Sequence, residues 1–204
     1  DRAQDKEGRA YRHSFDMLGE SALTHADAER YFVAYQEAIR AIGGRGPHAN
    51  VIDAPSISVK LSALHPRYEV AKRARVHAEI TPKVLALARL ADAAGIDFLL
   101  PIGRWKGYGG ETDFHGTTLE TVTWACGLLA ATQRITVFGT VHAPLFHPLI
   151  AAKEFVTADH IGEGRFGLNI VAGWNEGEFE MFGVAQREHE ERYAFAQEWM
   201  DVVR

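Results

Sequence analysis

The chain has 204 residues, of which 47% are hydrophobic, and a formal net charge of −5. These values allow one sizeable core, so we expect a single domain over residues 1–204, and the interspersed charges argue against a nucleic-acid-binding surface. A lone cysteine, Cys126, and the lack of any apolar stretch near the roughly 18 residues of a membrane span predict a cytoplasmic protein without disulfide or membrane segment.

The first 95 residues alternate short apolar runs with helical patterns. We expect a strand over residues 13–18, a helix that begins at a capping box of Thr24 and Asp27 and ends at Gly43-Gly44, and a second strand over residues 56–62. A second helix is predicted from Thr81-Pro82, because proline suits a first turn, to Gly95. The predicted buried face of the first helix comprises Ala28, Tyr31, Phe32, Tyr35, Ile39 and Ile42.

The remaining residues continue the same alternation. The stretch "IDFLLPIGRWKGYGG" supplies a third strand, and Thr117 or Thr118 is expected to cap a helix through Thr132. Further strands are predicted over residues 135–141 and 165–171, and further helices over 148–161 and 187–204. The last helix has a predicted buried face of Tyr193, Ala196, Trp199, Met200 and Val203. Five strands separated by helices are expected to be parallel, in a (β/α) barrel or an open doubly wound sheet.

In either architecture ligands bind at the carboxyl ends of the strands, and here those ends are polar or aromatic. Lys60 lies in an apolar strand, where it either pairs with Asp16 or Glu20 or awaits an anionic substrate. Arg104 either pairs with an acid or holds a ligand, and Asn169 favours a polar ligand. We find no P-loop, dinucleotide fingerprint, serine nucleophile elbow or metal-ligand spacing, so no metal is expected.

Two stretches near the amino terminus, "RHSFDMLGESALT" and "SISVKLSALHPRY", resemble the barrel of bacterial proline dehydrogenase, the FAD-dependent part of the bifunctional proline-utilisation enzyme. The resemblance covers residues 12–68. It implies that Lys60 lies at the substrate carboxylate and that Glu20 takes part in an ion-pair gate, which makes both of them candidate catalytic residues.

From about residue 90 the chain resembles a different family. The stretches "FLLPIGRWKGYGG", "ITVFGTVHAPLFHPLIAAKEFVTADHIGEGRFGLNIV" and "GWNEGEFEMFG" are similar to the luciferase-like flavin monooxygenases, especially those that act on small organosulfur or pyrimidine compounds. The resemblance implies FMN as cofactor, a small-molecule substrate and a partner flavin reductase. Ala172 departs from the Cys or Thr expected before Gly-Trp. The residues implied to bind FMN are Gly103, Arg104, Asn169, Glu178, Arg192 and Tyr193.

Both families are flavin-dependent (β/α)₈ barrels, so the chain is expected to be a chimera-like, partial TIM barrel of the α/β class. We expect a proline-dehydrogenase-like segment over residues 1–80, a seam helix over 81–95 and a monooxygenase-like segment over 96–204. The favoured function is an FMN-dependent monooxygenase or a fragment of one. The alternatives are a recombined or engineered half-barrel scaffold without activity, and an FAD-dependent proline dehydrogenase fragment. Exposed sheet edges further predict a homo-oligomer.

Overall fold

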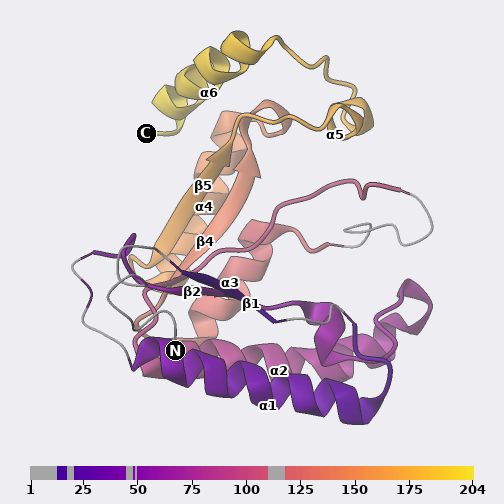
Figure 1. Ribbon diagram of the computed structural model, residues 1–204. Helices are drawn as coiled ribbons and strands as arrows, with labels where there is room; N and C mark the ends of the chain where they lie inside the picture. Colours follow the sequence, from indigo (N-terminus) through magenta and orange to yellow (C-terminus); the bar gives the residue numbers. More distant parts are fainter. Residues whose placement is uncertain (1–12, 18–20, 45–47, 49, 110–117) are drawn as a thin grey trace. The chain divides into compact units, whose positions relative to one another are not determined.

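The computed structural model describes residues 13–17, 21–44, 48, 50–109 and 118–204, and the chain divides into two compact units, residues 1–97 and 98–204. Each unit is built from parallel strands that alternate with helices (Figure 1). The predicted α/β class with parallel strands is therefore confirmed. The strands of the described residues form two sheets, one in each unit, and neither sheet closes into a barrel there.

The first unit contains a two-stranded parallel sheet and two long helices. Strand β1 (Ser14–Asp16) pairs with β2 (Ser56–Ser58), and α1 (His25–Gly43) connects them. The predicted capping box is confirmed: Thr24 N donates to Asp27 Oδ2 at 3.0 Å, and Asp27 N donates to Thr24 Oγ1 at 3.1 Å. Of the predicted face of α1, four residues are buried, namely Ala28, Tyr35, Ile39 and Ile42.

The predicted second strand and second helix differ from the structure. Strand β2 stops at Ser58 and is followed by two short 3₁₀ helices, η3 (Leu61–Leu64) and η4 (Val70–Lys72). Helix α2 (Arg73–Ala94) starts before Thr81, so the predicted start was wrong, and Pro82 lies inside the helix. An i,i+4 pair, Arg75 Nε to Glu79 Oε1 at 2.6 Å, supports this earlier part. Gly95 (φ 81°) ends the helix as predicted.

The second unit contains a three-stranded parallel sheet in the order β3 (Phe98–Leu99), β4 (Thr136–His142), β5 (Phe166–Val171). Its helices are α3 (Thr121–Ala131), η5 (Ala143–Leu145), α4 (Pro148–Gly162), α5 (Glu176–Met181) and α6 (His189–Val203). Helix α3 packs against β4, and α4 packs against β5, α3 and α6. The core of this unit comprises Val122, Val141, Ala143, Ala151, Phe155, Ala158 and Trp199, with Cys126 packed against it.

Two local predictions in the second unit were wrong, and one short helix was missed. Glu120, not Thr118, caps α3, because its carboxylate accepts from Val122 N at 2.9 Å and Thr123 N at 2.7 Å; Thr117 lies outside the described residues. Helix α5 was not predicted at all. Tyr193 on α6 is 60% exposed rather than buried, whereas Trp199 is buried as predicted.

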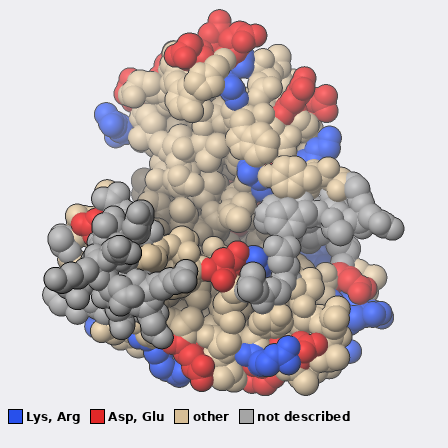
Figure 2. Space-filling view, viewed as in Figure 1, with Lys and Arg blue, Asp and Glu red and all other residues tan. Residues whose placement is uncertain are grey.

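Basic and acidic side chains are interspersed over the face of the molecule shown in Figure 2, and acidic ones gather over α6. Glu190 and Glu191 lie in the first turn of α6, where the helix dipole favours negative charge. No helix in the described part of the chain is long and apolar enough to cross a membrane.

Candidate functional site

One peptide group at the end of the strand β3 segment is held at both of its polar atoms. Thr118 Oγ1 donates to the carbonyl of Arg104 at 2.6 Å, and the amide of Trp105 donates to Glu178 Oε1 at 2.9 Å. These partners come from the loop before α3 and from α5, both distant in sequence. The Arg104–Trp105 peptide therefore has a fixed orientation at the carboxyl edge of the sheet.

Glu178 and His142 form a buried pair beneath that peptide. Both are only 1% exposed, and Glu178 Oε2 lies 3.5 Å from His142 Nε2. Burial lowers the pKa of His142 below its ordinary value; the charge of Glu178 acts to raise it, and that of Arg104 acts to lower it. The balance favours a neutral imidazole at the end of β4, beside a carboxylate that also accepts the Trp105 amide.

The Arg104 side chain extends towards the loop after β5. Its guanidinium carbon lies 4.9 Å from the centre of the Trp174 ring, a cation–π contact, and Nη1 donates to the carbonyl of Gly103 at 3.3 Å. Its Nε is buried and has no hydrogen-bond partner among the described residues. Trp174 is 54% exposed and stacks with Tyr108, so the guanidinium lies beside an accessible aromatic surface.

Thr140 on β4 joins the neighbouring strands. Its hydroxyl donates to the carbonyl of Pro101 at 2.7 Å and accepts from Asn169 Nδ2 at 3.2 Å. A Cβ on Gly103 would lie 2.8 Å from Thr140 Cγ2, so the glycine leaves room for the threonine methyl group. Asn169 and Gly103 are thus brought together through Thr140.

Arg192 reaches the same edge of the sheet from α6. Its Nη1 donates to the carbonyl of Gly173, which has a φ of 86°, and its Nε is buried without a hydrogen-bond partner in the described chain. The adjacent Tyr193 is exposed, and its ring packs on His189 with centroids 5.0 Å apart. Contacts therefore connect five of the six FMN candidates to the strand ends, and Tyr193 stands outside them.

The candidates of the first unit are arranged differently. Lys60 Nζ lies 3.1 Å from Asp16 Oδ2, which matches one of the two alternatives open from the sequence, and Lys60 N donates to Tyr35 Oη at 3.1 Å. Glu20 lies outside the described residues. The structure thus engages the Lys60 ammonium with a carboxylate of the neighbouring strand.

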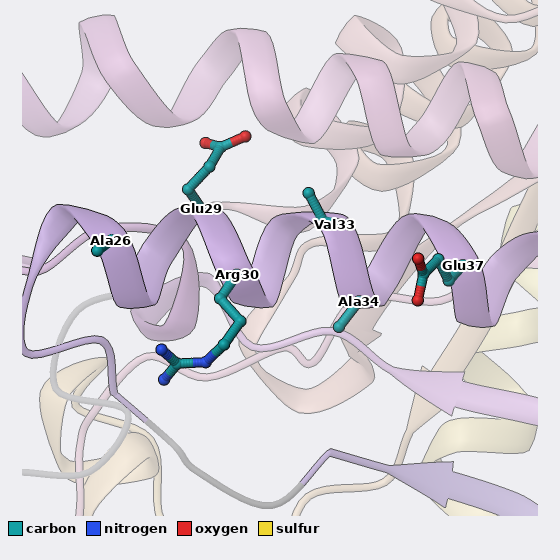
Figure 3. A pocket seen from close by; sticks show the side chains of 6 residues that line it. All are labelled: Ala26, Glu29, Arg30, Val33, Ala34 and Glu37. Carbon is teal, nitrogen blue, oxygen red and sulfur yellow. The ribbon is translucent and has the colours of Figure 1, made fainter.

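A shallow hollow runs along one face of α1 (Figure 3). Its lining comes entirely from that helix: Ala26, Glu29, Arg30, Val33, Ala34 and Glu37. Residues of one helix face create an open groove rather than an enclosed cavity, and it contains none of the predicted site residues. We do not place a site there.

Sequence reasoning missed the roles of Thr118, Thr140 and His142. All three were close to recognised strand ends or caps, but these partners lie 14 to 39 positions away in the sequence. Nothing in the local pattern indicates those pairings. A histidine at the end of an apolar run was the available sequence signal for His142.

Comparison with known proteins assigns the chain to a family. The sequence model described as luciferase-like monooxygenase matches residues 69–204, two thirds of the chain. The chain belongs to the luciferase-like monooxygenase family. A second model, described as proline dehydrogenase, matches residues 1–101. The two matches cover different parts of the chain and share residues 69–101, so the chimera-like composition predicted from the sequence is confirmed.

Individual relatives divide the chain in the same way. The bifunctional protein PutA of Escherichia coli is 49% identical over 89 residues, which are 44% of this chain and 7% of PutA. The pyrimidine monooxygenase RutA of Pseudomonas syringae is 38% identical over 120 residues, which are 58% of this chain and 33% of RutA. The chain therefore spans a third or less of the length of these relatives.

Solved structures agree on the fold. Monooxygenase RslO1 from Streptomyces bottropensis aligns with 62% of this chain and 36% of its own, with a TM-score of 0.53 and 24% identity, a likeness of fold alone. Proline utilization A (PutA) from Bradyrhizobium japonicum aligns with 79% of this chain and 16% of its own, with a TM-score of 0.51 and 31% identity. The predicted partial TIM-barrel type is thereby confirmed.

Luciferase-like monooxygenases and proline dehydrogenases are flavoenzymes, so we tested whether the strand ends suit a flavin. A flavin offers carbonyl and phosphate oxygens, which need donors, and a flat ring, which needs an apolar or aromatic surface. Arg104 and Arg192 each have a buried Nε donor without a partner among the described residues, and Trp174 offers an exposed ring beside them. These features fit one wall of a flavin site.

Proposed function

We propose that residues 98–204 form one wall of an FMN site and that the chain is a flavin-dependent monooxygenase, or a fragment of one, acting on a small organic substrate. When bound and reduced by a partner reductase, the flavin supplies the two electrons with which one atom of O₂ enters the substrate and the other leaves as water. An organosulfur compound or a pyrimidine is the substrate class that we favour, in keeping with the name of the RutA relatives.

One observation carries the proposal: two arginines, each with a buried Nε donor that has no partner among the described residues, flank the same dipeptide, Gly173-Trp174. Arg192 donates to the carbonyl of Gly173, and the Arg104 guanidinium lies over the Trp174 ring. A buried guanidinium donor without a partner is costly, and an anionic or carbonyl oxygen of a ligand satisfies it. The site is thus suited to a ligand with acceptor oxygens next to a ring.

The remaining candidates have supporting roles in this proposal. Asn169 offers a side-chain amide from β5, with its orientation fixed by Thr140. Gly103 has no side chain and so leaves room for the Thr140 methyl group at the strand end. Glu178 holds the Trp105 peptide, and Tyr193, exposed on α6, is available to a ligand beyond the sheet edge.

The test is FMN binding to the purified 204-residue chain, followed by absorbance of the flavin that elutes with the protein from a sizing column. We expect FMN to coelute, and riboflavin, which lacks the phosphate, to bind more weakly; FAD provides the comparison with the proline dehydrogenase family. The elution volume also tests the expected homo-oligomer. A colourless protein peak after incubation with FMN would contradict the proposal and favour an inactive scaffold.

A matched pair of variants localises the site. R104M removes the guanidinium but keeps a long side chain, and it should raise the FMN dissociation constant about tenfold, the effect of losing one charge-assisted hydrogen bond of about 1.5 kcal/mol. R40M changes an exposed arginine of α1 and should leave the constant unaltered. Equal effects of the two variants would place the flavin elsewhere.

Proline oxidation remains the second alternative, with Lys60 and Glu20 as its candidates. The Lys60–Asp16 ion pair does not favour it, because the ammonium already has a carboxylate partner. Reduction of an artificial electron acceptor by the chain with FAD and proline would reverse this preference.

A further inference from the structure

The Glu178 carboxylate lies between the backbone amide of Trp105, in the segment after β3, and the imidazole of His142 at the end of β4. Oε1 accepts from the Trp105 amide at 2.9 Å, and Oε2 lies 3.5 Å from His142 Nε2. Glu178 is 1% exposed, so water does not compete for either oxygen. A buried carboxylate with this little exposure is stable only when donors surround it.

The second candidate donor is the imidazole of His142, whose Nε2 faces Glu178 Oε2. This Nε2 is buried and has no hydrogen-bond partner among the described residues, and Glu178 Oε2 lies 3.5 Å from it. A neutral imidazole carries its proton on one of the two ring nitrogens. A proton on Nε2 would point at a carboxylate oxygen, whereas a bare Nε2 would place a lone pair against a negative charge.

The same carboxylate controls the Arg104–Trp105 peptide. Thr118 holds the carbonyl of this peptide at 2.6 Å, and Glu178 holds its N–H, so rotation of the peptide would break one of two hydrogen bonds. The Arg104 side chain leaves the backbone at this peptide. Its direction over the Trp174 ring therefore depends on the orientation that Glu178 fixes.

We propose that Glu178 is a positioning residue that does not contact the flavin: its two oxygens hold the Trp105 amide and the Nε2–H tautomer of His142, and through that peptide they aim Arg104 at the ligand. The last step rests on the proposed function; the first two concern the ligand-free protein. Helix α5 has other anchors, since Phe182 packs on Trp105 with centroids 5.0 Å apart and Glu180 Oε2 lies 3.9 Å from Lys106 Nζ. Loss of the Glu178 charge should therefore leave α5 in place.

The E178Q variant tests whether Glu178 acts through its two acceptor oxygens or only fills space in the core. The amide has the size of the carboxylate but only one acceptor, and its nitrogen is a donor, so it cannot accept from both N–H groups. If its oxygen keeps the Trp105 amide, its NH₂ faces His142 and shifts the imidazole to the Nδ1–H tautomer. If its oxygen turns to His142, the Trp105 amide loses its acceptor.

The experiment is NMR of the full, flavin-free chain labelled with ¹⁵N at histidine and tryptophan. We expect His142 as the Nε2–H tautomer in the unaltered protein, and in E178Q either the other tautomer or an upfield shift of the Trp105 amide proton with faster exchange. E180Q, which neutralises an exposed carboxylate of the same helix, should change neither signal. An Nδ1–H tautomer in the unaltered protein would overturn the proposal even if E178Q failed to fold, as would unchanged signals in a folded E178Q.

A binding measurement then tests the link to the ligand. E178Q should raise the FMN dissociation constant about tenfold, the scale seen when a residue that orients a ligand-binding group is changed, and E180Q should not. If the unaltered chain binds no FMN, the proposed function fails, while the NMR signals still decide whether Glu178 holds the peptide and the imidazole. If FMN binds equally to both variants, the aiming of Arg104 by Glu178 is wrong.

Discussion

Thr140 on β4 and Asn169 on β5 are register partners whose side chains are hydrogen-bonded to each other, with Asn169 Nδ2 3.2 Å from Thr140 Oγ1. The same hydroxyl donates to the carbonyl of Pro101 at 2.7 Å, so one side chain joins all three strand segments of the second unit. A polar group at this place in the sheet is thereby satisfied within the protein. It also fixes the amide that we propose faces the flavin.

Removal of the Thr140 hydroxyl should destabilise the second unit. T140V keeps the shape of the side chain but leaves the Pro101 carbonyl and the Asn169 amide without this partner, which should lower the free energy of unfolding by about 1–3 kcal/mol. All four tryptophans, Trp105, Trp124, Trp174 and Trp199, lie in residues 98–204, so urea unfolding followed by tryptophan fluorescence reports on this unit alone. T140S keeps the hydroxyl and should unfold at a higher urea concentration than T140V; identical midpoints would contradict the prediction.

The contact between Gly103 and Thr140 predicts a coupled effect. In G103A the new methyl group would lie 2.8 Å from Thr140 Cγ2, and overpacking of this kind costs about 1–3 kcal/mol. T140S removes Cγ2, so the double variant G103A/T140S should be more stable than the sum of the single effects predicts. The fluorescence unfolding curves of the four proteins measure this coupling, and strict additivity would show that the two residues do not clash.

Features that depend on neighbours in sequence could be predicted. The Thr24–Asp27 capping box is a local exchange of two hydrogen bonds, and Gly95 ends α2 because it adopts a left-handed conformation. Pro148 marks the start of α4, because a proline suits the first turn, where its missing N–H costs no hydrogen bond. The start of α2 was predicted wrongly. Pro82 suits the first turn of a helix, yet α2 already begins at Arg73 and continues through the proline.

Features that depend on distant partners could not be predicted. Strand β2 stops at Ser58, and shortly after it the amide of Lys60 donates to the hydroxyl of Tyr35, a residue on α1, instead of to a neighbouring strand. The pairing of His142 with Glu178 joins residues 36 positions apart, and α5 brings them together. The family resemblance indicated Glu178 as a cofactor residue, but its burial, its hydrogen bond from the Trp105 amide and its contact with His142 were visible only in the structure.

Arg165 should be important for the stability of the second unit. Its guanidinium donates to the carbonyls of Leu129, Thr132 and Ile135, at 2.9, 3.1 and 3.0 Å, and to the hydroxyl of Thr132 at 3.2 Å, so it joins the end of α3 to the start of β5. A cation is also favourable at a helix carboxyl terminus. R165M should lower the free energy of unfolding by at least about 1.5 kcal/mol. R204M, at the exposed chain end, is the control, and equal stability of the two variants would refute this role.

The burial of His142 predicts a pH dependence of the second unit. In the unfolded chain the imidazole takes up a proton as the pH falls through its ordinary pKa of 6.5, whereas burial, together with the charge of Arg104, lowers the pKa of His142 in the folded protein. The unfolded state therefore binds more protons below that pH, so this contribution to stability is complete at higher pH and is lost as the pH falls from 6.5 towards the folded-state pKa.

A variant comparison isolates this contribution from those of the other nine histidines. Tryptophan-fluorescence unfolding in urea at about pH 8 and about pH 5.5 should show a larger loss of stability for the unaltered chain than for H142Q, whose amide does not titrate. H77Q replaces an exposed histidine of α2 and should follow the unaltered chain. If H142Q loses as much stability on acidification as the unaltered chain does, His142 is not the group that resists protonation at this strand end.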